Sequence, residues 1–218
     1  MSYATANGVP CVQARVSLPR DGAWTAALIL DTDEAVTGRV AISLQGLELI
    51  GTARIAASYA GATHLRVTGG AGGLGIEMQP RAWTNVPLRV PLDYLLAASS
   101  ETLSQFSDTG ILESQLPFWS MMGEPAGAAL AHMVDQHEDA VWRMTPEGKI
   151  WIGRESWPEV SIPYEVVSAD PLADSLTIYS EVPAVYPGTS FLGRRVSYVE
   201  HTIGETARTR VLFEEERT

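Results

Sequence analysis

The segment Arg39-Val40-Ala41-Ile42-Ser43-Leu44 alternates Val, Ile and Leu with Arg, Ala and Ser. This period of two is typical of a β-strand with one buried and one solvent-facing side. Other runs rich in Val, Ile, Leu and Thr lie around it, at Val12–Leu18, Trp24–Leu30, Leu47–Ala57 and His64–Thr68. Turn-forming clusters separate these runs. Because no helix is expected between them, the first part of the chain is predicted to form an antiparallel barrel or sandwich rather than a βαβ sheet.

The middle of the chain changes to a helical period. A helix is predicted to begin at Pro91, a residue suited to the first helical turn, with an apolar face of Leu92, Leu95, Leu96, Leu103 and Phe106. A second helix is predicted to begin near Gly123-Glu124-Pro125, with an apolar stripe of Ala126, Leu130, Met133, Val134 and His137. Ser107–Ser120 between them is predicted to be a loop. Val141–Gly153 has two short β runs around a Pro-Glu-Gly turn, which predicts a hairpin.

The strand pattern then returns. The predicted strands are Val160–Ser168, Ser175–Ile178, Arg194–Ile203 and Thr206–Phe213, with a tight turn at Gly204-Glu205. The fold class is therefore mainly β with a small helical insertion (α+β). We expect a first β domain at 1–90, a helical insertion with a β-hairpin at 91–158, and a second β domain at 159–218 that can share strands with the first.

Composition narrows the function classes. The 218 residues are 45% hydrophobic and 19% charged, enough apolar material to bury a core. The net charge of -11 disfavours nucleic-acid binding by charge. The single cysteine, Cys11, can close no intrachain disulfide and supply no cysteine-based zinc site. We expect no cleaved export signal and no membrane insertion, since no basic start precedes an apolar run and no stretch approaches about 18 apolar residues.

One glycine-rich segment satisfies a dinucleotide-binding pattern. Gly70-Ala71-Gly72-Gly73-Leu74-Gly75 matches G-x-G-x-x-G and follows a predicted strand. The motif needs a helix to begin at the glycines, whereas Ile76–Pro80 is short and ends in a proline. We therefore expect a close-packed turn and no bound cofactor.

The remaining candidate sites do not satisfy the patterns that their chemistry needs. His132 and His137 lie about 140° apart on a helix, so they cannot easily share a metal with Asp135 and Glu138. Asp31, Asp33 and Glu34 lack the further ligands and the glycine of a calcium loop. Gly188–Gly193 has one residue too many for a nucleophile elbow, and a strand-like segment follows it. The run Glu214–Glu216 is interpreted as a solvated tail, and the six tryptophans mainly as core. No catalytic, cofactor or metal residue is predicted.

Four features in order resemble phage tail or baseplate hub proteins. They are Val67–Leu74, then Pro87–Val90 leading into the helix and on to Ser104, then the hairpin Trp142–Gly153 with Glu155 and Trp157-Pro158, and finally Gly193–Ile203. The resemblance is to the phage Mu type hub and late control D family, which is related to the N-terminal part of type VI secretion spike proteins. It covers roughly Val40 to Phe213.

The resemblance implies two β-barrel-like tube domains with a helical insertion, and a homotrimeric ring of pseudo-sixfold symmetry. Such a baseplate hub connects the hexameric tail tube to the trimeric spike or tail tip and forms part of the DNA-ejection channel. The implied partners are further copies of the chain, the tail tube protein, a spike or tail-tip protein and other baseplate proteins, with no sequence-specific nucleic acid and no cofactor. The implied location is the virion tail or baseplate, assembled in the host cytoplasm.

Two other functions remain open at this point. A tail-associated peptidoglycan hydrolase would need two carboxylates across a cleft, and none can be paired from the sequence. A carbohydrate-binding β module would use exposed tryptophans. The net charge of -11 also favours an acidic or neutral channel wall, although acids that only keep the subunit soluble explain it nearly as well.

Overall fold

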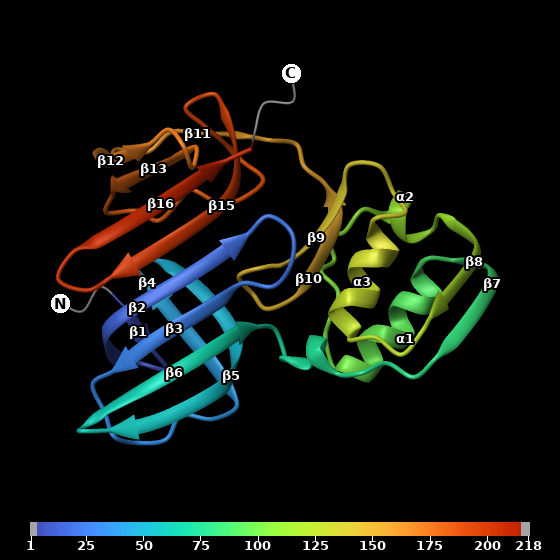
Figure 1. Cartoon of the computed structure of the whole chain (residues 1–218), viewed down its shortest axis with the longest axis horizontal. Coiled ribbons are helices and arrows are strands. Elements are labelled where there is room, and N and C mark those ends of the chain that lie inside the picture. The colour runs from blue at the N-terminus through green and yellow to red at the C-terminus, as the bar shows by residue number, and fades with distance from the viewer. Residues whose placement is uncertain (1–3, 215–218) are drawn as a thin grey trace.

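The first β part of the chain closes into a barrel in the computed structural model, which describes residues 4–214. Its strands are β1 (Ala4–Ala6), β2 (Val9–Pro19), β3 (Thr25–Leu30), β4 (Arg39–Leu44), β5 (Leu47–Tyr59) and β6 (Ala62–Gly69). They pair in the order β1-β4-β5-β6-β3-β2, and a β1–β2 pairing closes the circle (Figure 1). Of the two predicted antiparallel architectures, a barrel or a sandwich, the first β part forms the barrel.

Alternation along each strand fills this barrel. Val40, Ile42 and Leu44 of β4 are buried, whereas Arg39 is exposed. Trp24 is also buried, and its indole N–H donates to the carbonyl oxygen of Thr145 over 3.2 Å. Because Thr145 lies outside the barrel strands, this bond ties the barrel to the middle of the chain.

The second β part extends the same sheet. Its strands are β11 (Glu159–Val160), β12 (Glu165–Asp170), β13 (Ser175–Tyr179), β14 (Ser190–Phe191), β15 (Arg194–Ile203) and β16 (Ala207–Phe213). β15 pairs with β2, and the sheet continues β15-β16-β13-β12, while β14 pairs with β15 and β11. No pairing between residues 4 and 214 joins β12 to β11 or β14. The structure therefore shows one closed barrel with an open extension, and a second closed barrel is not shown.

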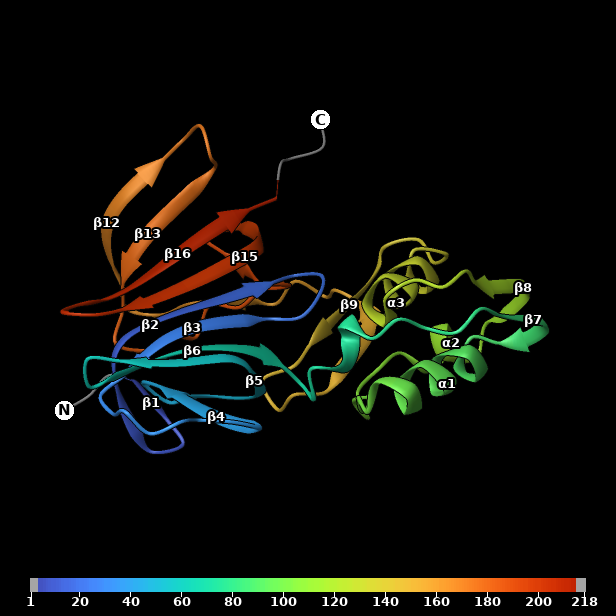
Figure 2. The ribbon, with the colours of Figure 1, turned by 60° about the horizontal axis from the view of Figure 1, so that its bottom comes forward.

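The middle part of the chain projects from the barrel (Figure 2). It contains a 3₁₀ turn (Gly73–Gly75), β7 (Arg81–Pro87), α1 (Arg89–Ser99), α2 (Thr109–Leu112), β8 (Gln115–Met121), α3 (Ala126–Val134), β9 (Ala140–Met144) and β10 (Ile150–Arg154). The predicted hairpin is confirmed as β9–β10, with Trp142 opposite Ile152. It lies between the barrel and the helices in both views. None of the helices within residues 4–214 is long and apolar enough to cross a membrane.

Two predictions about the first helix and the loop after it are wrong. Helix α1 ends at Ser99 because Ser100 adopts a left-handed conformation, with φ of 58°. Leu103 and Phe106 therefore lie outside the helix, and Phe106 is 78% exposed. The predicted loop Ser107–Ser120 contains α2 and most of β8. Asp108 begins α2 by accepting the amide of Gly110 over 2.8 Å, and β8 pairs with β7.

Two further boundaries differ from the prediction. The strand predicted at Val160–Ser168 is divided into β11 and β12, with Ser161–Tyr164 outside both. Pro163 lies in this gap and has no amide proton to donate to a ladder. Helix α3 ends at Val134, so His137 follows the helix and does not belong to its apolar stripe.

Candidate functional site

The glycine-rich loop after β6 binds a carboxylate of the chain itself. The side chain of Glu101 accepts the amide of Ala71 at Oε2 over 2.9 Å and the amide of Gly73 at Oε1 over 2.9 Å. Glu101 is only 5% exposed. Backbone amides that point toward one anion in this way form a nest. Two amides of the glycine-rich segment, those of Ala71 and Gly73, are therefore already bonded to Glu101 and not free for a phosphate.

Glycine is required in this loop for two separate reasons. Gly72 has φ of 80°, a left-handed conformation that β-branched residues resist. Gly73 lies so close to the end of α1 that a Cβ there would overlap the carbonyl oxygen of Ser99. A short 3₁₀ turn follows instead of a helix. These features agree with the turn that the sequence indicates.

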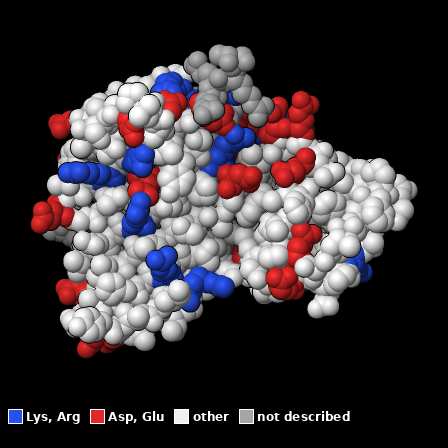
Figure 3. All heavy atoms as spheres, in the orientation of Figure 1, with Lys and Arg blue, Asp and Glu red and all other residues white. Residues whose placement is uncertain are grey.

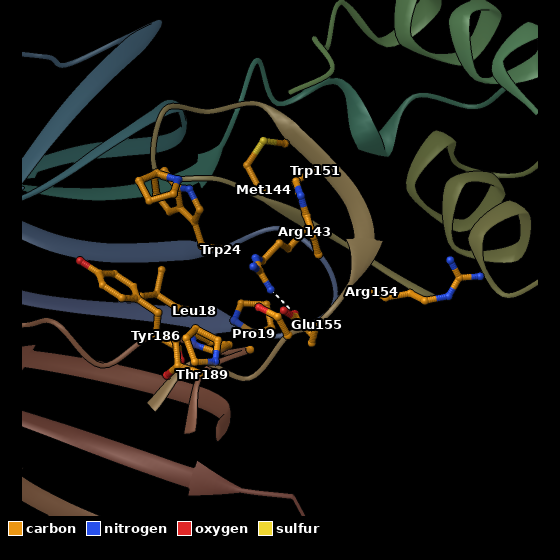
Figure 4. A pocket seen from close by; sticks show the side chains of 15 residues that line it. Leu18, Pro19, Trp24, Arg143, Met144, Trp151, Arg154, Glu155, Tyr186 and Thr189 are labelled. Atoms are coloured by element: carbon orange, nitrogen blue, oxygen red, sulfur yellow. Dashed lines mark hydrogen bonds and ion pairs between the residues drawn. The ribbon is translucent and has the colours of Figure 1, made fainter. Parts of the chain in front are cut away.

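A pocket of about 360 Å³ lies where the barrel, the β9–β10 hairpin and the second β part meet. Trp24, Met144 and Trp151 lie on one side of it, and Leu18 and Tyr186 lie on the other (Figure 4). Arg154 also lines the pocket but directs its guanidinium away, toward the carbonyl of Glu138 and the carboxylate of Asp108. The lining is therefore mainly apolar and aromatic.

Two charged residues of this pocket, Arg143 and Glu155, are bonded to each other. Arg143 donates to Glu155, and its guanidinium stacks on Trp151 at 4.3 Å from the ring centre. Burial raises the pKa of Glu155, and the Arg143 charge opposes this shift. Among the described residues that line the pocket, Glu155 is the one carboxylate. A glycosidase-type pair of acids across this pocket is therefore not formed by these residues.

The histidines and acids of the middle part do not converge. The Nδ1 of His132 lies 2.8 Å from a carboxylate oxygen of Glu124, whereas the Nε2 of His137 lies 3.1 Å from the hydroxyl of Ser114. Within residues 4–214, no three His, Cys, Asp or Glu side chains are placed to hold a metal ion. The structure thus directs the two histidines to different partners.

The other acidic candidates serve as loop and end contacts. Thr32 accepts the backbone amide of Glu34 through its hydroxyl over 3.1 Å, in the turn between β3 and β4. Glu214 pairs with Arg20 and lies 3.9 Å from Arg195. Glu215 and Glu216 lie outside the described residues. Gly188–Gly193 forms a turn and the short strand β14, with no helix after it.

The tryptophans are packed inside the fold or against arginines. Trp24, Trp83 and Trp142 are buried. Trp157 is half-buried, with the guanidinium groups of Arg20 and Arg195 at 5.3 and 4.9 Å from its ring. A sugar-binding platform needs exposed ring faces, and these four rings do not provide one. The sequence patterns assign no bonding partner to Glu101 or Glu155, because the amides that Glu101 accepts and the guanidinium that Glu155 accepts are brought to them only by the fold.

Comparison with known proteins shows the fold. No family model matches the chain, and no curated protein matches it in sequence. Among solved structures, the 43 kDa tail protein of prophage MuSo2 from Shewanella oneidensis superposes with a TM-score of 0.73 at 10% identity, covering 97% of this chain and 96% of that one. The E. coli c3393 protein, a component of the type VI secretion system with structural similarity to the T4 tail proteins gp27 and gp5, gives 0.70 at 10% identity and covers 98% and 77%.

A third match is a chain of the Francisella PdpA-VgrG complex, with a TM-score of 0.56 at 8% identity and coverage of 95% and 54%. Each match covers almost the whole of this chain, including the barrel, the middle part and the extended sheet. The chain therefore has the fold of phage tail proteins and of related type VI secretion components.

Proposed function

We propose that this chain is a structural protein of a phage tail, a baseplate hub that connects the hexameric tail tube to a trimeric spike or tail tip. In this proposal the chain forms a homotrimeric ring around the DNA-ejection channel and has no catalytic chemistry of its own. Its partners are the tail tube protein, a spike or tail-tip protein and other baseplate proteins. It resides in the virion tail after assembly in the host cytoplasm.

The observation that carries the proposal is the shared fold over 97% of the chain with a prophage tail protein. The match spans both β parts, which is what a subunit with two tube domains requires. We assign 1–90 to the first tube domain, 91–158 to the insertion and 159–218 to the second tube domain. Strand β2 joins the two tube domains by pairing with both β3 and β15.

Two exposed strand edges support assembly with further copies. All six residues of β12 are exposed, and Val166 and Val167 expose 58% and 44% of their surface. Beyond Thr52, β5 pairs with β6 but not with β4, and its residues from Arg54 to Tyr59 are exposed. Exposed edges of this kind tend to pair with another chain unless they are protected. Pairing one edge with the other edge of the next copy is a head-to-tail contact, which can close a ring.

The test is native mass spectrometry of the chain co-expressed with its tail partners, together with electron microscopy of the purified complex. We expect a closed trimer and a ring-shaped particle. The variant Val166→Lys/Val167→Lys places two charges on the β12 edge and should abolish the trimer while the monomer keeps its melting temperature. Val90→Lys, at an exposed position of α1, is the matched control.

Persistent monomers, or dimers only, in the presence of the partners would overturn the ring. If the Val166→Lys/Val167→Lys variant forms the trimer normally, β12 is not the trimer interface, and the proposed hub function is unaffected. Zymography on cell-wall substrate addresses the hydrolase alternative separately.

A further inference from the structure

The outer face of the sheet is basic although the chain as a whole is acidic. Strand alternation places side chains of β2, β3, β4, β5, β6, β15 and β16 either toward the core or on this outer face. The face carries five arginines: Arg15, Arg39, Arg66, Arg208 and Arg210. The acids of these seven strands are Glu48 and Glu200. The outer face of the sheet is therefore positively charged, although the net charge of the whole chain is -11.

The register of the strands arranges these arginines in two neighbouring rows. The first row crosses five strands as Arg208, Thr202, Arg15, Ala27 and Arg66. Arginines thus recur on every second strand, about 10 Å apart. The second row runs Arg210, Glu200, Ser17, Thr25, Thr68, Thr52 and Arg39. Four hydroxyl side chains lie between its arginines.

Most of this positive charge is available to a ligand. Arg39, Arg66 and Arg208 are exposed and form no ion pair with any described residue. Arg15 pairs with Glu200 at 2.8 Å but keeps 64% of its side chain exposed. Lys and Arg gather over the strands in Figure 3, while Asp and Glu lie mainly at the margin and over the middle part. At about 0.1 M salt, charges more than about 10 Å away are screened, so the local charge governs this face.

We propose that this face binds the phosphate backbone of double-stranded DNA without sequence preference. The proposal rests on the proposed function, in which DNA passes through the assembled ring. Arg, Ser and Thr are residues that contact phosphate oxygens in protein–DNA complexes, and the two rows present these types together. Protein interfaces are enriched in aromatic side chains and Met as well as Arg, whereas these two rows contain no aromatic residue and no Met among their Arg, Thr, Ser, Ala and Glu.

Contacts of this type are compatible with DNA movement. A backbone contact releases counterions and carries no sequence information, so a protein can slide along the duplex. The nearby Glu200 keeps Arg15 partly paired, which limits how strongly this part of the face holds a phosphate. The face therefore guides DNA through weak, salt-sensitive contacts.

The experiment uses the purified chain and fluorescence anisotropy with two 20-base-pair duplexes of unrelated sequence, between 30 and 200 mM salt. We expect equal binding of both duplexes, with affinity that falls at least about tenfold over this range. The variant Arg66→Gln/Arg208→Gln should lose at least about fivefold in affinity at 30 mM salt, and its plot of log affinity against log salt should be shallower by about 2. Arg89→Gln/Arg154→Gln, on the middle part, is the matched control and should bind like the unaltered chain.

No binding at 30 mM salt would overturn the proposal, as would equal binding by the Arg66→Gln/Arg208→Gln variant. Sedimentation velocity separates a different occupant of the face: loss of self-association in this variant, without DNA binding by the unaltered chain, would identify a protein interface instead. Circular dichroism confirms that each variant is folded. Because these measurements do not require a ring, their failure is distinct from a failure to form the trimer.

Discussion

Replacing His201 by glutamine should remove a pH dependence of stability that the fold builds into the centre of the sheet. His201 is 3% exposed, its Nδ1 lies 2.9 Å from the hydroxyl of Thr209, and its Nε2 has no hydrogen-bond partner among the described residues. Burial lowers its pKa from 6.5 to about 4. As pH falls below about 6.5, His201 is protonated in the unfolded chain but stays neutral in the folded chain. The free energy of unfolding therefore falls.

The size of this effect follows from the two pKa values. Between pH 7 and pH 5, the shift from 6.5 to about 4 removes about 2 kcal/mol of the free energy of unfolding. The contribution of His201 to the free energy of unfolding is fully present at neutral pH and is lost progressively as the pH falls toward about 4. Urea denaturation at pH 7 and pH 5 measures it as the change in the stability difference between the native chain and His201→Gln. Contributions from carboxylates and other histidines are common to both chains and cancel.

The matched control is His64→Gln, an exposed histidine on β6. It should lose as much stability between pH 7 and pH 5 as the native chain loses. If the glutamine variant does not fold, NMR titration of the native chain provides the same test, with the His201 ring remaining neutral down to about pH 4. A stability difference that is constant between the two pH values, or a ring that titrates near pH 6.5, would refute the reasoning.

Three further outcomes are expected. Gly72→Val should lower the free energy of unfolding, measured by urea denaturation, by about 1–3 kcal/mol, because φ is 80° at this position. Adding NAD, FAD or ATP to the native chain should leave its melting temperature unchanged, and a rise of several degrees would contradict the expectation that no cofactor binds. Glu101→Gln should cost about 2 kcal/mol because it removes the charge from an acceptor of two backbone amides, that of Ala71 and the buried one of Gly73, whereas the exposed Glu147→Gln should cost almost nothing. Cys11 should react with a disulfide reagent at pH 8 about a hundredfold more slowly in the folded chain than in urea, since burial raises its pKa to about 11; equal rates would show an accessible thiolate.

The sequence patterns correctly predicted those strands and turns that are determined by residues close together in the chain. The alternation at Arg39–Leu44 places Val40, Ile42 and Leu44 in the barrel, and the Pro-Glu-Gly turn correctly locates the β9–β10 hairpin. Strand β7 was not predicted, because it is stabilised by pairing with the distant strand β8. Trp83 of β7 lies opposite Trp119 of β8, with 35 residues between them in the sequence. The end of α1 was also misplaced, since nothing in the local sequence requires Ser100 to be left-handed. Asp108 is a residue type that favours a helix start, yet its segment was predicted to be a loop. Pro163 is a residue type that interrupts a strand, yet one continuous strand was predicted across it.

The site features depend on contacts between distant segments. Glu101 binds amides about 30 residues earlier in the chain, so only the fold shows that the glycine loop is filled. The first arginine row likewise needs the register of five strands, because Arg15, Arg66 and Arg208 are far apart in sequence. Composition averages such charges over the whole chain. Sequence reasoning could therefore predict the fold class but not which surface carries which charge.

Strand β2 gives this fold a mechanical property. Tyr198–Ile203 of β15 pair with Ala14–Pro19, while β3 is bonded along the opposite edge of the same strand. A force that pulls the two β parts apart along the strand direction loads these backbone bonds together in shear, so none can open alone. Separating the parts would also leave Ala14–Pro19 of β2 without a pairing strand on that edge and expose its backbone groups to water. The chain should therefore transmit axial load as one rigid element and yield in a single cooperative event.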